Sequence, residues 1–348
     1  MAPHTPVIAS EVDDLRDVCG WDAPFFTAVL PARSDVADAE HRLEVRWGNA
    51  RRQLSPQWTD DDVSDIESLL AGIGHDGGAA LAIVRGGDGH TLTEFLPASP
   101  GSAAVHEGVL PALAPIIEGR QRSLAHVVVE ADKSGADIVA FAGANVLATD
   151  RVDGEELHIH RGHPGGWSQQ RFQQRAENTW NDNADDVADT AASLAEQIGA
   201  QLIAVAGPPR AKAMVADALA ERTGVDVVKV DSGDPDGIAA DVVTLLDDAH
   251  ARSVAALSER FRDGLANDAA VAGIEATIDA LVEGRVDTLL VNDDWTDDTV
   301  LDRRVMDIEP GARAVDAAVA AALRTDADVV VVPNLAAMEG PVGALLRW

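Results

Sequence analysis

A chain of 348 residues is longer than one ordinary hydrophobic core, so its length predicts two or three domains. Hydrophobic residues make up 46% of the sequence and charged residues 25%, which excludes a wholly disordered chain. The 59 acidic and 27 basic residues give a net charge of -32, which excludes binding of nucleic acid over the whole surface and leaves only a local contact.

The sequence has neither a long apolar run nor a basic leader, so we expect a cytoplasmic protein without a membrane partner. Cys19 is the only cysteine, which excludes an internal disulfide and a multi-cysteine metal site. We expect Cys19 to be a small core residue. No pattern predicts a cofactor or a metal.

The first 122 residues predict a mixed α/β domain. The expected elements are a helix over Glu11–Val18, a strand over 24–32, a helix over Ser34–Leu54 capped by Ser34 or Asp35, a helix near Asp62–Gly72, and a hairpin turning at 86–89. Four prolines between Pro97 and Arg122 indicate connecting chain rather than core, so we place a domain boundary near residue 122.

Residues 123–262 predict a middle domain in which strands come first and then alternate with helices. The expected strands are 125–132, 137–143, 145–149, 156–160, 202–207 and 225–230, with helices through Val187 and from Pro209 to Gly224. This order is that of a ribonuclease H-like mixed sheet covered by helices. Metal-dependent nucleases of that fold need carboxylates inside the strands, and we interpret Asp137 only as a strand-start residue.

The last part of the chain predicts a second α/β unit. A helix over Ala239–Leu265 leads out of the middle domain, and residues 266–348 form the third domain. Its expected elements are a helix over 270–284, a strand over 286–292, a helix over 312–326, and strands over 328–333 and 342–348. The acidic run after this strand contains neither the glycine nor the terminal glutamate of a calcium loop, so it predicts a solvated acidic loop. Its acids are Asp293, Asp294, Asp297 and Asp298.

The segment from Leu157 to Ala176, LHIHRGHPGGWSQQRFQQRA, has three arginines, three histidines and no acid. Its glycines permit a close approach of the backbone to a partner. Trp167 can stack on a base, and Arg161, Arg171 and Arg175 can contact phosphates. If a helix begins near Ser168, Arg171 and Arg175 lie one turn apart. The alternative is a surface hairpin whose tryptophan folds back and whose arginines pair with the protein's own acids.

Three other patterns are weaker. His158, His160 and His163 suggest zinc, but no carboxylate or cysteine nearby completes the ligand set. Residues 45–59 carry Arg46, Arg51 and Arg52 with Trp47 and Trp58, and form either a second RNA contact or one face of a helix. The run VAGPPRAKAM turns from a strand into a helix whose N-terminus can face a phosphate, but it lacks the usual glycine-rich patterns.

The sheet order, the motif GGWSQQRFQQR and the run LVEGRVDTLLVNDDW together resemble the bacterial branch of the archaeo-eukaryotic release-factor family. These proteins are relatives of class-I release factor and pelota, and the branch includes Rv2629-like actinobacterial proteins and the hibernation factor Balon. The resemblance implies three domains, a tRNA mimic whose middle-domain loop enters the peptidyl-transferase centre, and a ribosomal-protein-like last module. That module is implied to bind elongation factor Tu or a similar translational GTPase.

One departure from the family bears on activity. Release factors have Gly-Gly-Gln, whereas here Trp167 and Ser168 separate Gly165 and Gly166 from Gln169. Hydrolysis needs a donor within about 3 Å of the reacting atoms, and two extra residues displace Gln169 by more than that. This displacement argues against catalysis, and the resemblance implies a hibernation factor that occupies the A site under stress without cleaving peptidyl-tRNA. The alternatives are an active peptidyl-tRNA hydrolase that uses Gln169 and a non-ribosomal phospho-ligand-binding protein.

The expected RNA-binding residues share flexibility, positive charge or an aromatic ring, and they lie in the two acid-free segments. They are Arg161, His163, Gly165, Gly166, Trp167, Ser168, Gln169, Arg171, Arg175, Arg46, Arg51 and Arg52.

Overall fold

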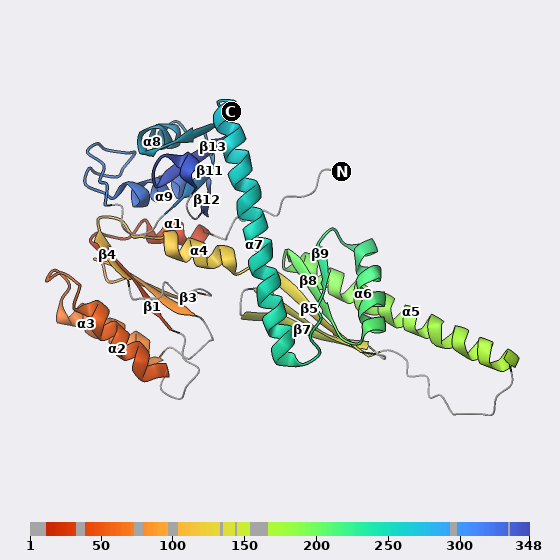
Figure 1. Ribbon diagram of the computed structural model, residues 1–348. Helices are drawn as coiled ribbons and strands as arrows, with labels where there is room; N and C mark the ends of the chain where they lie inside the picture. The colour runs from red at the N-terminus through yellow and green to blue at the C-terminus, as the bar shows by residue number, and fades with distance from the viewer. Residues whose placement is uncertain are drawn as a thin grey trace. The chain divides into compact units, whose positions relative to one another are not determined.

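The computed structural model describes residues 12–32, 39–72, 79–96, 104–132, 135–142, 145–153, 166–292, 298–332 and 335–348, with side chains except those of 39–42 and 166–180. The strands of these residues form three β-sheets, which helices cover (Figure 1). One unit consists of Met1–Arg122 with Ala251–Trp348, and the other of Ser123–His250. The expected mixed α/β fold is confirmed, whereas the division into three domains stays a prediction.

The first sheet has the order β3-β2-β1-β4 and is antiparallel throughout. Its strands are β1 (Phe25–Pro31), β2 (Ala80–Gly86), β3 (Thr91–Leu96) and β4 (Ala104–Gly108). The predicted hairpin is confirmed as β2 and β3. Side chains alternate between the two faces of a strand, so β1 sends Phe26 and Leu30 to one buried cluster and Phe25 and Val29 to another.

Helices cover both faces of this sheet (Figure 1). They are α1 (Asp13–Val18), α2 (Ala39–Arg51), α3 (Asp60–Gly72) and α4 (Ala114–Arg122). The expected caps Ser34 and Asp35 lie outside the described residues. The expectation that the chain from Pro97 to Arg122 only connects is wrong, because β4 completes the sheet and Ile116 and Ile117 of α4 are fully buried.

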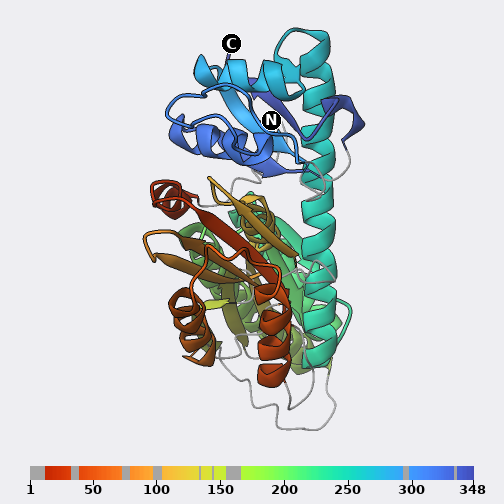
Figure 2. The ribbon, with the colours of Figure 1, turned by 90° about the vertical axis from the view of Figure 1, so that its left-hand side faces the viewer.

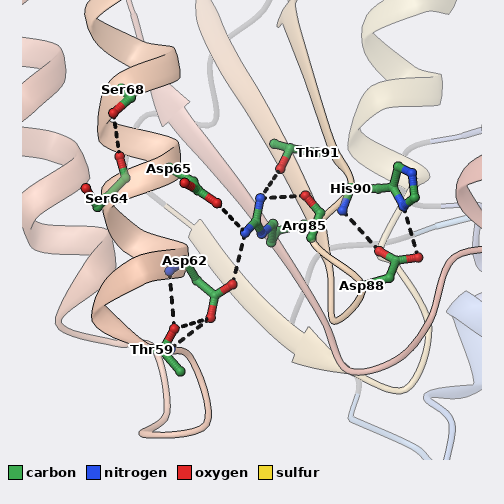
Figure 3. Close-up of polar contacts among 10 residues, drawn as sticks. Thr59, Asp62, Ser64, Asp65, Ser68, Arg85, Asp88, His90 and Thr91 are labelled. Atoms are coloured by element: carbon green, nitrogen blue, oxygen red, sulfur yellow. Dashed lines mark hydrogen bonds and ion pairs between the residues drawn. The ribbon is translucent and has the colours of Figure 1, made fainter.

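Arg85 ties α3 to the β2–β3 hairpin (Figure 3). Its guanidinium donates to Asp62 and Asp65, each at 2.9 Å, and to the Gly89 carbonyl at 2.6 Å. Thr59 and Asp62 exchange hydrogen bonds at the start of α3, so the helix begins with a capping box. These bonds lower the pKa of Asp62, chiefly through the hydroxyl of Thr59.

The last sheet belongs to the same unit and has the order β10-β13-β11-β12. Its elements are β10 (Ala270–Ala272), α8 (Ile274–Val282), β11 (Val286–Val291), α9 (Ala314–Arg324), β12 (Asp328–Val331), a short 3-10 helix (Ala336–Met338) and β13 (Val342–Leu346). Only β11 and β12 are parallel among these pairs. The single helix predicted over 270–284 is wrong, because Gly273 has a φ of 81° and separates β10 from α8.

Helices α8 and α9 pack on one face of the last sheet, whereas Leu257 and Phe261 pack on the other. Both belong to the C-terminal part of α7 (Pro235–Ala266), which runs alongside this sheet (Figure 2). The helices α1 and α4 share one hydrophobic cluster with α8 and α9, and Cys19 is buried in it as expected. Burial raises the pKa of its thiol to about 11, so the group is an unreactive thiol at neutral pH.

The middle unit has the sheet order β7-β6-β5-β8-β9. Its elements are β5 (Ala125–Ala131), β6 (Gly135–Ala142), β7 (Asn145–Asp153), α5 (Gly166–Gln197), β8 (Leu202–Ala206), α6 (Pro209–Arg222) and β9 (Asp226–Lys229). Antiparallel β7, β6 and β5 are followed by parallel β8 and β9, which confirms the ribonuclease H-like order. The strand expected over 156–160 lies outside the described residues.

Helices α5 and α6 pack on one face of this sheet, and the first part of α7 packs on the other (Figure 1). The interpretation of Asp137 as a strand-start residue needs correction, because β6 begins at Gly135 and Asp137 lies within the strand. Its carboxylate accepts a hydrogen bond from Arg151 at 2.8 Å. Among the described residues no group of acids, histidines and cysteines is arranged to hold a metal.

Candidate nucleic-acid interface

The acid-free segment continues directly into α5, which begins at Gly166. The helix therefore starts two residues before the expected Ser168, and Gly166, Trp167, Ser168 and Gln169 all have helical backbone. The first turn of α5 contains no acidic residue. The unpaired N–H groups and the helix dipole at this end both favour an anion.

The expected RNA-binding residues of this segment divide into two sets. Arg171 and Arg175 lie in α5, so the same helix places them one turn apart along its axis. The side chains from Gly166 to Trp180 are not described. Arg161, His163 and Gly165 lie outside the described residues, as do the zinc candidates His158 and His160.

The second half of α5 anchors the helix on the sheet. Asn183, Val187, Ala188 and Ala191 are buried, and the three apolar residues among them join the cluster formed with β5, β6 and α6. About 25 Å of helix lies between Gly166 and Asn183, at 1.5 Å per residue. Figure 1 shows this part of α5 running past the end of the sheet. A rigid helix therefore carries the start of α5 away from its own domain.

The second acid-free segment has a different role. Trp47 and Trp58 are buried with 2% and 8% of their surface exposed, and the rings of both pack around Phe26. Trp58 and Phe26 meet edge to face, with 4.8 Å between ring centroids. Burial leaves neither ring free to stack on a base. Trp47 lies in α2, whereas Trp58 lies in the connection between α2 and α3, so the alternative of one face of a helix holds for Trp47 alone.

The arginines of this segment also contact their own protein. Arg51 forms ion pairs with Glu67 at 3.0 Å and Asp60 at 3.6 Å. Arg46 donates to the Pro31 carbonyl, and Arg52 donates to Asn49. The structure therefore does not bring Arg46, Arg51 and Arg52 together as an open cationic surface, and an RNA contact at these residues remains a prediction.

Pairing with the protein's own acids extends through the described part of the chain. The arginines held in such ion pairs are Arg16, Arg51, Arg85, Arg120, Arg122, Arg151, Arg222, Arg260, Arg285, Arg303, Arg304, Arg313 and Arg324. Some of these pairs are local, such as Arg122 with Glu118, whereas Arg120 pairs with Asp14 and Glu94, which are distant in sequence and which composition does not predict. Because acidic residues outnumber basic ones 59 to 27, these ion pairs still leave a net negative charge on the described surface.

The end of the sheet at β8 carries the other phosphate candidate. Helix α6 follows Gly207, which has a φ of 124°, and no side chain caps its N-terminus. A pocket of about 100 Å³ lies beside it, between α5, α6 and the end of β5. Most of its lining residues are apolar, including Val187, Met214 and Val215. This lining favours an apolar group over a phosphate.

Comparison with known proteins identifies the class of the middle segment. Residues 125–267 match the model of the bacterial archaeo-eukaryotic release factor family 2. The match begins at the first residue of β5 and ends one residue after α7. The resemblance to the release-factor family that the sequence predicts is therefore confirmed for this segment.

Several known proteins are similar to this chain along most of its length. The protein Rv2629 of Mycobacterium tuberculosis strain H37Rv is 25% identical over 96% of each chain. Archaeal Pelota, from a model of ribosome-bound Pelota and ABCE1, is 17% identical over 100% of this chain and 98% of its own, with a TM-score of 0.43. The archaeal translation termination factor aRF1 is 18% identical over 96% of each chain, with a TM-score of 0.25.

No helix in the described part of the chain combines the length and the apolar character that a membrane-spanning helix requires.

Proposed function

We propose that this protein is a ribosome-binding translation factor that occupies the A site during stress and directs the Gly165–Arg175 segment toward the peptidyl-transferase centre without hydrolysis. The observation that carries the proposal is the start of α5. An otherwise acidic chain has here a helix whose first turn lacks acids and whose next turns carry Arg171 and Arg175. Ribosomal RNA is the anion that such a cationic projection fits best.

The rigidity of α5 supports the same proposal. A helix anchored from Asn183 onward transmits the position of its domain to its own N-terminus. Because the projecting part of α5 is already an ordered helix, less entropy is lost when Arg171 and Arg175 contact phosphates. The net charge of -32 opposes any broader approach to RNA, so binding depends on this projection.

The position of Gln169 supports occupation without cleavage. Its backbone lies in the first turns of α5, whereas a catalytic glutamine has to reach the ester from a glycine-rich turn. The hydrogen bonds of the helical backbone hold Gln169 in place. The first turn of α5 therefore has to unwind before Gln169 can move toward the ester. Peptidyl-tRNA hydrolysis through Gln169 is the competing function.

A ribosome-pelleting assay tests the cationic projection. We expect Arg171→Glu/Arg175→Glu to abolish cosedimentation at moderate salt, because both phosphate partners become repulsive. Arg151→Glu/Lys229→Glu is the matched control, since both cations are exposed, paired with acids and located in the same unit. Equal loss of binding in the two variants would show that only net charge matters and would overturn the proposal.

A release assay separates the two functions. Ribosomes loaded with labelled peptidyl-tRNA are mixed with the wild-type chain and with Gln169→Ala. We expect binding without release of peptide and no change on substitution. Release that depends on Gln169 would instead establish the hydrolase.

The same proposal includes association of residues 266–348 with elongation factor Tu or a similar translational GTPase. Copurification of the chain with that GTPase tests this association.

A further inference from the structure

A groove of about 550 Å³ lies in the last part of the chain, between the start of α8 and the segment 299–302. Leu301 contributes to its lining but is buried in the core, whereas Val300 has 60% of its surface exposed. Ala272, Ile274 and Ala276 supply further apolar lining. The combined lining of Val300, Ile274 and the two alanines gives this groove an apolar floor that a partner can cover.

Backbone hydrogen bonds hold both walls of the groove. On one wall the Leu301 N–H donates to the Ala312 carbonyl at 2.9 Å, and the Ala314 N–H donates to the Thr299 carbonyl at 2.7 Å. On the other wall the Gly273 N–H donates to Met338 and Val342 carbonyls at 2.8 and 3.1 Å. The groove is therefore preformed, which reduces the ordering cost of binding.

The rim of the groove is acidic. Glu275 lines one wall and Asp302 lines the other, and the side chain of Glu275 is 76% exposed. Asp279 follows one turn after Glu275 on α8. Arg303 lies 2.7 Å from Asp279 and 3.4 Å from Glu275. The hydrogen bond that Arg303 donates to Asp279 raises the pKa of Arg303, as do the charges of Asp279, Glu275 and Asp302.

Arg303 shows which chemistry this rim accepts. One guanidinium is already stabilised there by carboxylates, and three acids against one arginine leave a negative excess. A second cation in the groove could contact Glu275 on one wall and Asp302 on the other. The aliphatic stem of a lysine or arginine could then lie along Val300 and Ile274 while its charge reaches the rim.

We propose that this groove binds an extended basic segment of a partner protein, in which aliphatic and lysine or arginine side chains alternate. The aliphatic side chains fill the apolar groove, and the cations meet Glu275 and Asp302. This binding goes beyond the proposed function and requires neither α5 nor a ribosome.

RNA is the disfavoured occupant of the same groove. Phosphates would approach Glu275, Asp279 and Asp302 at short range, and like charges at short range repel. The nearby arginine is already engaged by two of these acids. Charge complementarity therefore favours a basic polypeptide.

Fluorescence anisotropy with the full chain tests the proposal. The probe is a labelled hexapeptide of alternating leucine and lysine, and its counterpart replaces lysine with glutamate. We expect the lysine peptide to bind, with weaker binding as salt is raised, and the glutamate peptide not to bind. Binding of both peptides with equal affinity would overturn the role of the acidic rim.

Two double variants locate the binding. Glu275→Gln/Asp302→Asn removes both rim charges but leaves Arg303 its shorter bond to Asp279, and we expect the Kd for the lysine peptide to rise about five- to tenfold. Asp61→Asn/Asp236→Asn changes the net charge equally at exposed helix starts elsewhere, and we expect an unchanged Kd. Equal effects of the two would assign the binding to overall charge and overturn the site.

A third variant tests the apolar wall. Val300→Ser keeps all charges, and we expect it to raise the Kd about threefold because it removes exposed apolar contact area. Circular dichroism melting checks that each variant is folded. A labelled oligouridine that binds the wild-type chain and is lost in Val300→Ser would show RNA in the groove and refute the proposal. Since no ribosome is present, failure here leaves the A-site proposal standing.

Discussion

His126 is a buried histidine whose environment favours the neutral ring. It has 4% of its surface exposed and stacks on Phe141, with 4.9 Å between ring centroids and 8° between ring planes. Nδ1 lies 2.9 Å from the Leu124 carbonyl. Burial lowers the pKa of His126 from its usual 6.5, and the contact with Leu124 opposes this only in part.

This histidine predicts a pH dependence of stability. Below about pH 6.5 the unfolded chain binds a proton that the folded chain refuses, so His126 makes the free energy of unfolding fall as the pH falls. The replacement His126→Phe keeps an aromatic ring against Phe141 and removes the titration. We expect urea unfolding at pH 7.5 and 5.5 to differ less in the variant than in the wild type. An unchanged difference would assign the acid sensitivity to other groups.

Single residues also show where sequence reasoning ends. Trp47 and Trp58 lie among arginines in the sequence, a pattern that is also typical of surface residues that stack on bases. In the structure both rings pack around Phe26. Phe26 lies on β1, more than twenty positions away from either tryptophan. Exposure of an aromatic ring depends on such distant partners, so a local pattern cannot predict it.

At the level of elements, Gln121 completes the edge of the last sheet. β12 is an edge strand, so backbone N–H and carbonyl groups on its outer side have no neighbouring strand to pair with. The Gln121 side chain, on α4, donates to the Val329 carbonyl at 2.9 Å and accepts from the Val331 N–H at 3.1 Å. It is only 2% exposed, so water does not compete for these groups. A residue of the first part of the chain thus extends a sheet of the last part.

This arrangement predicts a large cost for losing one amide. Gln121→Ala leaves a buried carbonyl and a buried N–H without partners, and we expect the free energy of unfolding to fall by about 2 to 4 kcal/mol. Gln57→Ala is the control, because Gln57 forms an exposed bond with Glu107. Urea denaturation measures both. Equal, small losses would mean that water replaces the amide at β12.

Among the elements, those with strong local patterns were predictable. The glycines at 86–89 marked the hairpin, and the strand order of the middle unit followed from alternating apolar runs. The exceptions are short or lie beside prolines. β10 has three residues, too few to show a period of two, and β4 follows a proline-rich run that resembles a linker.

At the scale of the whole molecule, charge dominates. At a net charge of -32 the acidic groups repel one another, and many of the described arginines already form internal ion pairs. Salt screens the repulsion between exposed acids over about 10 Å at 0.1 M and over shorter distances at higher concentration. Each surface ion pair is worth little, so its loss in salt offsets only a small part of this gain.

We therefore predict that salt stabilises the protein. The Tm is expected to rise by about 5 to 10 °C between 0.05 and 0.5 M potassium chloride, because screening relieves the folded chain more than the expanded one. Differential scanning calorimetry measures it. A Tm that falls over this range would show that the internal ion pairs contribute more than the repulsion costs.

The amino-acid sequence alone determined the α/β class, the ribonuclease H-like strand order and the acid-free segment that enters α5. These features are local, since periodicity, turn residues and charge are read within one stretch of chain. Tertiary structure decided that Trp47 and Trp58 are core, that Arg51 and Arg85 pair with acids of α3, and that Val300, Glu275 and Asp302 line one groove. Each depends on residues brought together from distant positions, and the geometry of packing, which no local pattern encodes, determines those contacts.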